Sequence, residues 1–143
     1  MGIFRHVAMG GLACLGLGAG QAAACSCPPS QSAAQQAEGY DLIAVVEVGE
    51  VWDLESEPTD PPSPFIIGEH ITQMKVQRVL KGEMSRYVLV KSADAGMPAC
   101  GVNYRPDTEL LLLAKGGEGV YSTWMCDRAQ FPVEDFEAAL DGE

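Results

Sequence analysis

Four cysteines, at positions 25, 27, 100 and 126, constrain the fold of this 143-residue chain more than any other feature. Cys25 and Cys27 form a Cys-Ser-Cys stretch directly after three alanines, and the other two lie far along the chain. An even number of cysteines in a small chain is typical of a disulfide framework, provided that the chain reaches an oxidising compartment. A fifth cysteine, Cys14, lies in residues 1–24, the segment that determines whether the chain reaches such a compartment.

Residues 1–24 have the pattern of a secretory signal peptide. Arg5 and His6 form a short basic start, residues 7–18 are apolar, and Ala22 and Ala24 occupy the two positions that signal peptidase reads. The apolar run is shorter than the about 20 residues of a transmembrane helix. We therefore expect residues 1–24 to be removed and residues 25–143 to form a single domain, exported to the periplasm or the extracellular space.

Two alternatives for this segment are a retained membrane anchor and a lipoprotein signal. An acylation signal also ends at a cysteine, but it usually carries Leu three residues earlier, where this chain has Ala22. Lipidation would also consume the thiol and the amine of Cys25 and leave an odd number of cysteines. Unless Cys25 is lipidated, we expect no contact with a membrane.

The charge balance excludes some classes of partner. Residues 1–24 hold one Arg and no acidic residue, so the remainder has 8 Lys and Arg against 20 Asp and Glu, a net charge of −12. Nucleic acid requires a basic face, which this composition does not supply. Solubility of an exported protein is the simplest explanation of the acidity.

The four cysteines can pair in three ways. A bond between Cys25 and Cys27 would close a very tight ring, because residues i and i+2 of an extended segment lie about 6.6 Å apart. Bridges from the N-terminus to Cys100 and to Cys126 are favoured, and each would stabilise the fold by about 4 kcal/mol in the chain-entropy model. A metal site of thiolates is the competing interpretation, but the paired C-x2-C spacing of such sites is missing.

Hydrophobic patterns predict five strands between two short helices. The expected strands are residues 42–52, 70–80, 87–91, 108–115 and 120–126, with a bulge at Gly49 and a glycine-rich hairpin at 116–119. Residues 30–38 are expected to form a helix capped by Ser30 or Ser32, and Pro132 is expected to open another. This element order predicts a partly open five-stranded barrel of the oligonucleotide/oligosaccharide-binding (OB) type or a small sandwich. Residues 53–69 are acidic, rich in proline and expected to be an exposed loop of unassigned role.

Catalytic motifs are missing from the sequence. His70 is the only histidine after residue 24, and no phosphate loop, metalloprotease motif or dinucleotide fingerprint occurs. The cysteines are better explained as bridged than as nucleophiles. We therefore expect a binding module rather than an enzyme, with no cofactor.

Five segments together resemble a known family: CSCPPS, AVVEVGEVW, MKVQRVLKG, PACGVNYRPDTELLLLA and VYSTWMC. In this order they are similar to the netrin-like (NTR) domain, in particular to the N-terminal domain of the tissue inhibitors of metalloproteinases. The resemblance implies an OB-type barrel with flanking helices. It also implies disulfides joining Cys25 with Cys100 and Cys27 with Cys126. Unlike those inhibitors, this chain has no further bridge soon after the first two cysteines and no second cysteine-rich domain.

The resemblance further implies that Cys25, as a free N-terminus, docks on the catalytic zinc of a partner metalloprotease. Its α-amino nitrogen and carbonyl oxygen would chelate the zinc, whose fourth position is open in such enzymes. The amine must lose a proton, and its reference pKa of about 7.7 to 8.0 makes this easy near neutral pH. Ser26 would point into the protease pocket, and Pro28 would stiffen the chain beyond Cys27.

By the same resemblance, Pro98 and Ala99 would form a neighbouring ridge, joined to Cys25 through Cys100. Two other functions stay open. The Cys-x-Cys stretch can simply tie the N-terminus to the barrel of a non-inhibitory NTR-type interaction module. A thiol-disulfide redox protein would require a thiolate of lowered pKa, and no Lys, Arg or His lies near Cys25 and Cys27 in the sequence.

Overall fold

The computed structural model of the protein describes residues 26–54, 68–84, 86–93 and 100–141. The predicted signal peptide at 1–24, Cys25, Pro98 and Ala99 lie outside these residues, as does most of the acidic loop. The described elements, in chain order, are α1 (Ala33–Glu38), β1 (Leu42–Leu54), β2 (Glu69–Lys81), β3 (Tyr87–Ala93), β4 (Glu109–Gly117), β5 (Val120–Thr123), η1 (Met125–Asp127) and α2 (Val133–Leu140).

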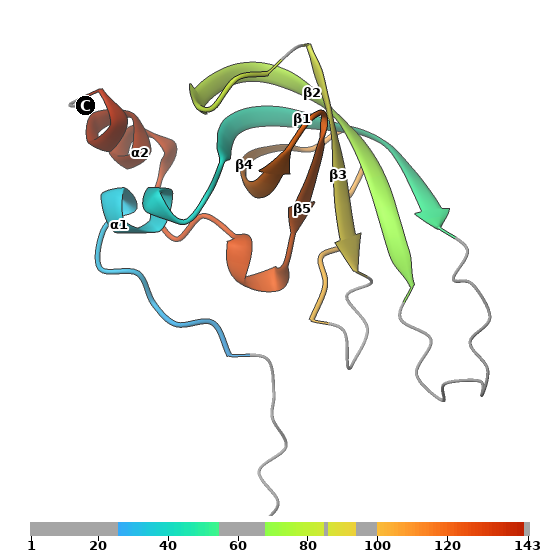
Figure 1. Ribbon diagram of the computed structural model, residues 1–143, viewed down its shortest axis with the longest axis horizontal. Helices are drawn as coiled ribbons and strands as arrows, with labels where there is room; N and C mark the ends of the chain where they lie inside the picture. Colours follow the sequence, from blue (N-terminus) through green and yellow to red (C-terminus); the bar gives the residue numbers. More distant parts are fainter. Residues whose placement is uncertain (1–25, 55–67, 85, 94–99, 142–143) are drawn as a thin grey trace, which may run out of the picture.

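The five strands form a closed barrel in the order β1-β2-β3-β5-β4 (Figure 1). Four of the neighbouring pairs are antiparallel, and β3 and β5 run parallel. The mainly β fold with an OB-type barrel and flanking helices is therefore confirmed. The barrel is closed and not partly open as expected, and the sandwich alternative is wrong. A closed barrel leaves fewer free strand edges than an open sheet.

Alternation of side chains along the strands fills the barrel. On β2, Thr72 and Met74 are buried and their neighbours are partly exposed, because successive side chains of a strand point to opposite faces. β3 repeats this alternation with Val88, Val90 and Ser92. The interior cluster consists of Leu42, Ala44, Val46, Val48, Met74, Val88, Val90, Leu112, Ala114 and Tyr121.

Strand β1 pairs with β2 along one edge and with β4 along the other, and it bends to do so. The register with β2 shifts between Val48 and Val51, around Gly49. A Cβ atom at position 49 would lie 2.9 Å from the backbone oxygen of Gln73, so the backbones approach too closely for a side chain there. The predicted bulge is confirmed, and it supplies the curvature that barrel closure requires.

The two helices lie side by side and cover one side of the barrel, around a second apolar cluster that includes Tyr40 and Phe136 (Figure 1). Helix α1 begins at Ala33 because the hydroxyl of Ser32 accepts a 3.1 Å hydrogen bond from the backbone nitrogen of Gln35. Of the two caps considered, Ser32 is the one used. Helix α2 follows Pro132, as predicted.

Several predicted element boundaries were wrong, by one to three residues. The fifth strand ends at Thr123, and residues 124–126 are not part of it, because η1 turns the chain there. The loop predicted at 53–69 is shorter than expected, since β1 continues to Leu54 and β2 begins at Glu69. Residues 55–67, which make up most of the predicted exposed loop, lie outside the described residues.

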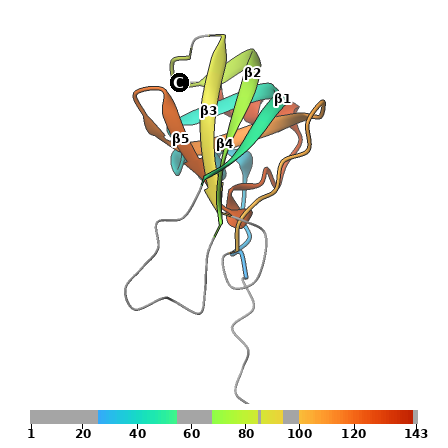
Figure 2. The same ribbon diagram turned by 90° about the vertical axis from the view of Figure 1, so that its right-hand side faces the viewer.

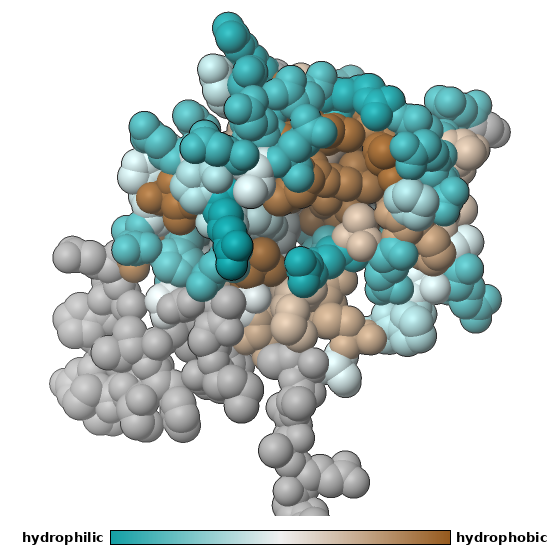
Figure 3. Space-filling model, turned by 180° about the vertical axis from the view of Figure 1, so that it is seen from behind, coloured by the Kyte–Doolittle hydropathy of each residue, from teal (hydrophilic) through white to brown (hydrophobic). Residues whose placement is uncertain are grey.

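Hydrophilic side chains cover much of the face in Figure 3, around an area where apolar side chains gather. The basic residues are few, and three of the eight after residue 24 form ion pairs with acids among the described residues: Lys75 with Glu47, Arg78 with Glu137 and Lys91 with Glu69. In the described part of the chain, no helix combines the length and the apolar character needed to cross a bilayer.

Candidate functional site

Residues 26–30 run along the segment 124–130 at one end of the barrel (Figures 1 and 2). Ser26, Cys27 and the two prolines that follow are exposed. A disulfide joins Cys27 to Cys126 across 99 residues of sequence, with 5.1 Å between their Cα atoms. The N-terminal segment is therefore attached to the barrel at its second described residue while its surface faces solvent.

A pair of glutamine side chains fixes this segment further. The Oε1 atom of Gln130 accepts a 2.8 Å hydrogen bond from the backbone nitrogen of Ser30, and its Nε2 donates to the carbonyl oxygen of Pro28 at 3.3 Å. Gln36, which is 4% exposed, accepts from the backbone nitrogen of Gln130 at 3.1 Å and donates to the carbonyl oxygen of Arg128 at 2.8 Å. Helix α1 thus holds the 128–130 segment, which in turn holds the N-terminal segment.

The η1 turn that carries Cys126 is organised by Asp127. One carboxylate oxygen accepts a 2.6 Å hydrogen bond from the backbone nitrogen of Trp124, and the other accepts a 3.0 Å bond from the hydroxyl of Tyr40. Burial, and then the negative charge of Asp127, raises the pKa of Tyr40 to about 12. The hydroxyl therefore keeps its proton and remains a donor over the physiological range.

Cys100 brings a third segment to the same place. Its carbonyl oxygen accepts a 3.1 Å hydrogen bond from the backbone nitrogen of Met125, next to Cys126. Its φ of 51° is in the left-handed region, which is uncommon for residues other than glycine and indicates a backbone fixed by its surroundings. The nitrogen of Val102 donates to the carbonyl oxygen of Ala93, so the end of β3 supports this segment.

The described residues test only one of the two predicted disulfides. The bond between Cys27 and Cys126 is the one that the resemblance implied. Cys100 also takes part in a disulfide, but Cys25 lies outside the described residues. The pairing of Cys25 with Cys100 therefore stays a prediction.

The structure brings together Ser26, Cys27, Pro28 and Cys100 at the turn that holds Cys126, and it adds residues that the sequence reasoning missed. Trp124 is 56% exposed, the most exposed of the large hydrophobic side chains of the described residues, and stands at the start of that turn. Trp124 lies two residues before the last cysteine, where the hydrophobic pattern predicts a strand. An Asp three residues later is, however, typical of a capped turn. Gln36 and Gln130 gave no sequence signal, because their role depends on contacts more than 90 residues apart.

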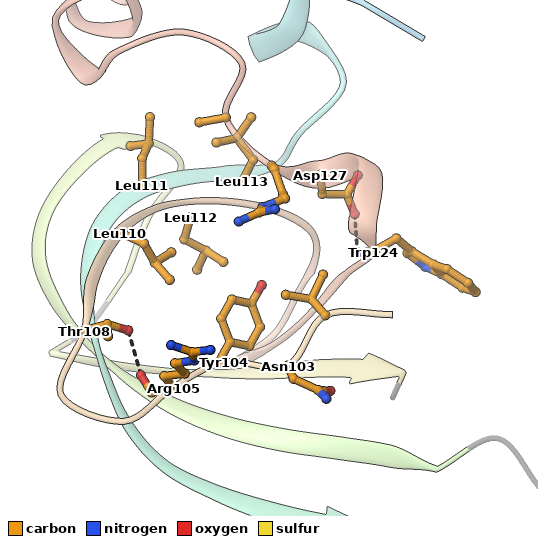
Figure 4. Close-up of a pocket in the computed structure, with 13 residues that line it drawn as sticks. Asn103, Tyr104, Arg105, Thr108, Leu110, Leu111, Leu112, Leu113, Trp124 and Asp127 are labelled. Carbon is orange, nitrogen blue, oxygen red and sulfur yellow. Dashed lines mark hydrogen bonds between the residues drawn. The ribbon is translucent and has the colours of Figure 1, made fainter. Parts of the chain in front are cut away.

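A cavity of about 520 Å³ lies beside this turn, between the first half of β4 and the segments 102–108 and 124–129 (Figure 4). Leu110, Leu112 and the ring of Tyr104 point toward its centre. The Tyr104 hydroxyl and the Thr123 hydroxyl are 2.8 Å apart. Burial raises the pKa of Tyr104, against the hydrogen bond from Thr123, which lowers it.

His70 pairs with Asp53 across β1 and β2, with 2.7 Å between Nδ1 and Oδ1. The two residues face each other in the register of the strands, so the pair is a cross-strand contact of an ordinary kind. Within the residues that the structure describes, no group of three His, Cys, Asp or Glu side chains could hold a metal ion.

Comparison of the sequence with family models and with curated proteins finds no match.

Proposed function

We propose that the protein is an exported, disulfide-bonded binding module that inhibits a zinc metalloprotease, with the free N-terminus at Cys25 as the chelating group. The observation that carries this proposal is the exposed segment 26–29, held against the barrel by the Cys27–Cys126 disulfide and by Gln130. Cleavage before Cys25 would place an α-amino group and a carbonyl oxygen directly ahead of this fixed segment.

The chemistry of a catalytic zinc suits such a ligand. A catalytic zinc keeps one position open beside three protein ligands, and water normally fills it. A neutral amine and a carbonyl oxygen from one residue can replace that water as a chelate. No side chain of this chain is required to bind the metal, so the zinc belongs to the partner.

Fixation of the segment favours tight binding. A flexible N-terminus would lose conformational entropy on entering a protease cleft, at about 0.5 to 1.5 kcal/mol for each immobilised side chain. Here Pro28 and Pro29 limit the backbone, and the Gln130 amide holds the carbonyl oxygen of Pro28. Ser26 is small and exposed, so it fits many pockets next to the scissile bond and selects weakly among them.

The exposed indole of Trp124 adds apolar contact area next to the segment. Aromatic side chains are enriched where protein interfaces bind most strongly. By the resemblance, Pro98, Ala99 and Cys100 form the adjoining part of the same surface. Cys25 to Pro28 and residues 98–100 are therefore the proposed partner-binding residues.

A non-inhibitory NTR-type interaction module is the second candidate. The same contacts that fix the segment are sufficient to attach an N-terminus to a barrel, and this observation favours a purely structural role for the disulfide. A thiol-disulfide redox protein is the third candidate, and an exchange assay without activity would exclude it.

The first experiment is the intact mass of the exported protein. We expect a chain that begins at Cys25, carries two disulfides and has no acyl group. An acylated N-terminus or four free thiols would contradict the proposal.

The second experiment is inhibition of a panel of zinc metalloproteases by the protein and by a variant with one extra Ala before Cys25. We expect inhibition by the protein and its loss in the extended variant, because the extra residue displaces the amine from the zinc. A control variant carries the extra Ala after Glu143, where it should change nothing. Equal inhibition by both N-terminal forms would exclude the chelate, and no inhibition of any protease would favour the interaction module.

A further inference from the structure

The cavity beside the η1 turn has an unusual distribution of charge for this chain. All eight Lys and Arg residues after position 24 lie in the described part of the structure. Lys75, Arg78 and Lys91 form ion pairs with Glu47, Glu137 and Glu69. Lys81 donates to the carbonyl oxygen of Ala37, while Arg86 and Lys115 stand over the rings of Tyr87 and Tyr40.

The two remaining cations are Arg105 and Arg128, and both line the cavity. Among the described residues, neither guanidinium group has an ion pair or a hydrogen-bond partner. In a chain with a large excess of acids, the two cationic groups that have no ion pair, hydrogen bond or ring contact among the described residues thus stand at one cavity. Charges of both signs act at its interior: beside the larger effect of burial, Asp127 raises the pKa of Tyr104 and Arg128 lowers it.

Asp127 lines the same cavity but does not neutralise the two arginines by direct contact. Its two carboxylate oxygens already accept hydrogen bonds from the Trp124 nitrogen and the Tyr40 hydroxyl. Within the described ranges, neither oxygen forms an ion pair or a hydrogen bond with Arg105 or Arg128, so both guanidinium groups remain available to a ligand. Guanidinium groups match carboxylate and phosphate oxygens in geometry, often with two parallel hydrogen bonds.

Apart from Asn103 and Thr108, the rest of the lining is apolar or aromatic. Leu110 and the ring of Tyr104 pack against the interior cluster that contains Leu112, and the three side chains point toward one another in Figure 4. The outer edge of the first half of β4 is paired only at the bridge between Leu112 and Arg128 in the described part of the chain, which leaves the cavity open. A volume of about 520 Å³ lies within the roughly 300 to 1,000 Å³ typical of small-molecule sites.

We propose that this cavity binds a small amphipathic anion, with its carboxylate or phosphate group at Arg105 and Arg128 and its apolar chain over the partly exposed Leu110 and Tyr104. The net charge of −12 repels anions at long range, but ions of the solution screen this repulsion within about 8 Å at physiological salt. Binding therefore depends on the two arginines at short range. This inference is independent of zinc chelation by Cys25.

The test is calorimetric titration of the disulfide-bonded protein with three probes of equal chain length: decanoate, decyl phosphate and decanol, each below its micelle concentration. We expect one or both anions to bind at least about 10-fold more tightly than decanol, because only the anions form charge-assisted hydrogen bonds with the guanidinium groups. The tighter of the two anions identifies the head group. Equal binding of decanol and the anions, or no binding of any probe at millimolar concentration, would overturn the proposal.

Two double variants test whether the anion binds at Arg105 and Arg128. The double variant Arg105→Gln with Arg128→Gln should weaken binding of the anion by about 10-fold or more while leaving that of decanol unchanged. The matched control, Lys75→Gln with Arg86→Gln, removes the same charge on the β2–β3 side and should change affinity less than about two-fold. Retained affinity in the first variant would overturn the proposal. The comparison of probes on the unaltered protein decides it even if that variant does not fold.

Discussion

The hydroxyl of Tyr40 donates a 3.0 Å hydrogen bond to Asp127 and so joins the residue after helix α1 to the turn that holds Cys126. Asp127 also accepts from the backbone nitrogen of Trp124. One carboxylate thus connects the helical side of the barrel, the exposed indole and the disulfide of the N-terminal segment. The proposed binding surface depends on this buried contact as much as on its own residues.

Stability at alkaline pH should report this contact. Burial and the charge of Asp127 raise the pKa of Tyr40 to about 12, above the value of about 10 in an unfolded chain. A raised folded pKa contributes stability that is fully present below pH 10 and is lost as pH rises to 12. We expect the free energy of unfolding in urea to fall over this window, and to fall less steeply in Tyr40→Phe.

The same variant has an expectation at neutral pH. Tyr40→Phe leaves one oxygen of Asp127 without its donor, so the free energy of unfolding should decrease by about 1 to 3 kcal/mol. Absorbance near 295 nm should also lose the tyrosine that ionises near pH 12. An identical alkaline profile in the variant and the unaltered protein would contradict the assignment of the shift to Tyr40.

The Cys27–Cys126 disulfide should contribute strongly to stability. It closes a loop of 99 residues, for which the chain-entropy model gives about 4 to 5 kcal/mol. We expect Cys27→Ser combined with Cys126→Ser to lower the free energy of unfolding by about this amount, as measured by denaturant titration at neutral pH. A loss below about 1 kcal/mol would mean that the hydrogen bonds of Gln130 alone fix the segment.

This double variant also separates the candidate functions. Both cysteines are replaced together so that no free thiol remains to form a wrong bridge. If the segment acts as a prearranged ligand, inhibition of the target protease should weaken even at temperatures where the barrel stays folded. Unchanged inhibition would show that fixation of residues 26–29 by this bond has no part in binding.

The strands were predictable because their signals are local. The alternation of Thr72 and Met74 with more polar neighbours marks one buried face, and Gly49 marks the bend. The order of five such strands between two helices was sufficient to expect an OB-type barrel or a small sandwich, and the resemblance to NTR domains implied the barrel. Whether the barrel closes depends on the pairing of β4 with β1 and of β3 with β5, which no local pattern encodes.

The surroundings of the site were less predictable for the same reason. The end of β5 at Thr123 is set by Asp127 and by the carbonyl oxygen of Cys100, which accepts from Met125. The Cys100 contact joins segments distant in sequence and could not be predicted, whereas the Asp127 contact spans three residues and is a local signal that strand propensity outweighed. The positions of Arg105 and Arg128 at one cavity could not be predicted either, because the fold, and not the local sequence, decides whether a side chain has a partner.

The side chain of Gln36 should be the most sensitive polar group near the N-terminal segment. It is almost fully buried and serves two backbone groups, the carbonyl oxygen of Arg128 and the nitrogen of Gln130. Gln36→Met keeps the size of the side chain but removes both partners, which should cost about 1 to 3 kcal/mol in the free energy of unfolding. Amide exchange at Gln130 should become faster as well.

The neighbouring Gln35→Met is the control: its side chain accepts an exposed hydrogen bond from Gln31, so we expect a change within about 0.5 kcal/mol. Equal effects of the two variants would mean that burial of the Gln36 amide does not set the position of the 128–130 segment.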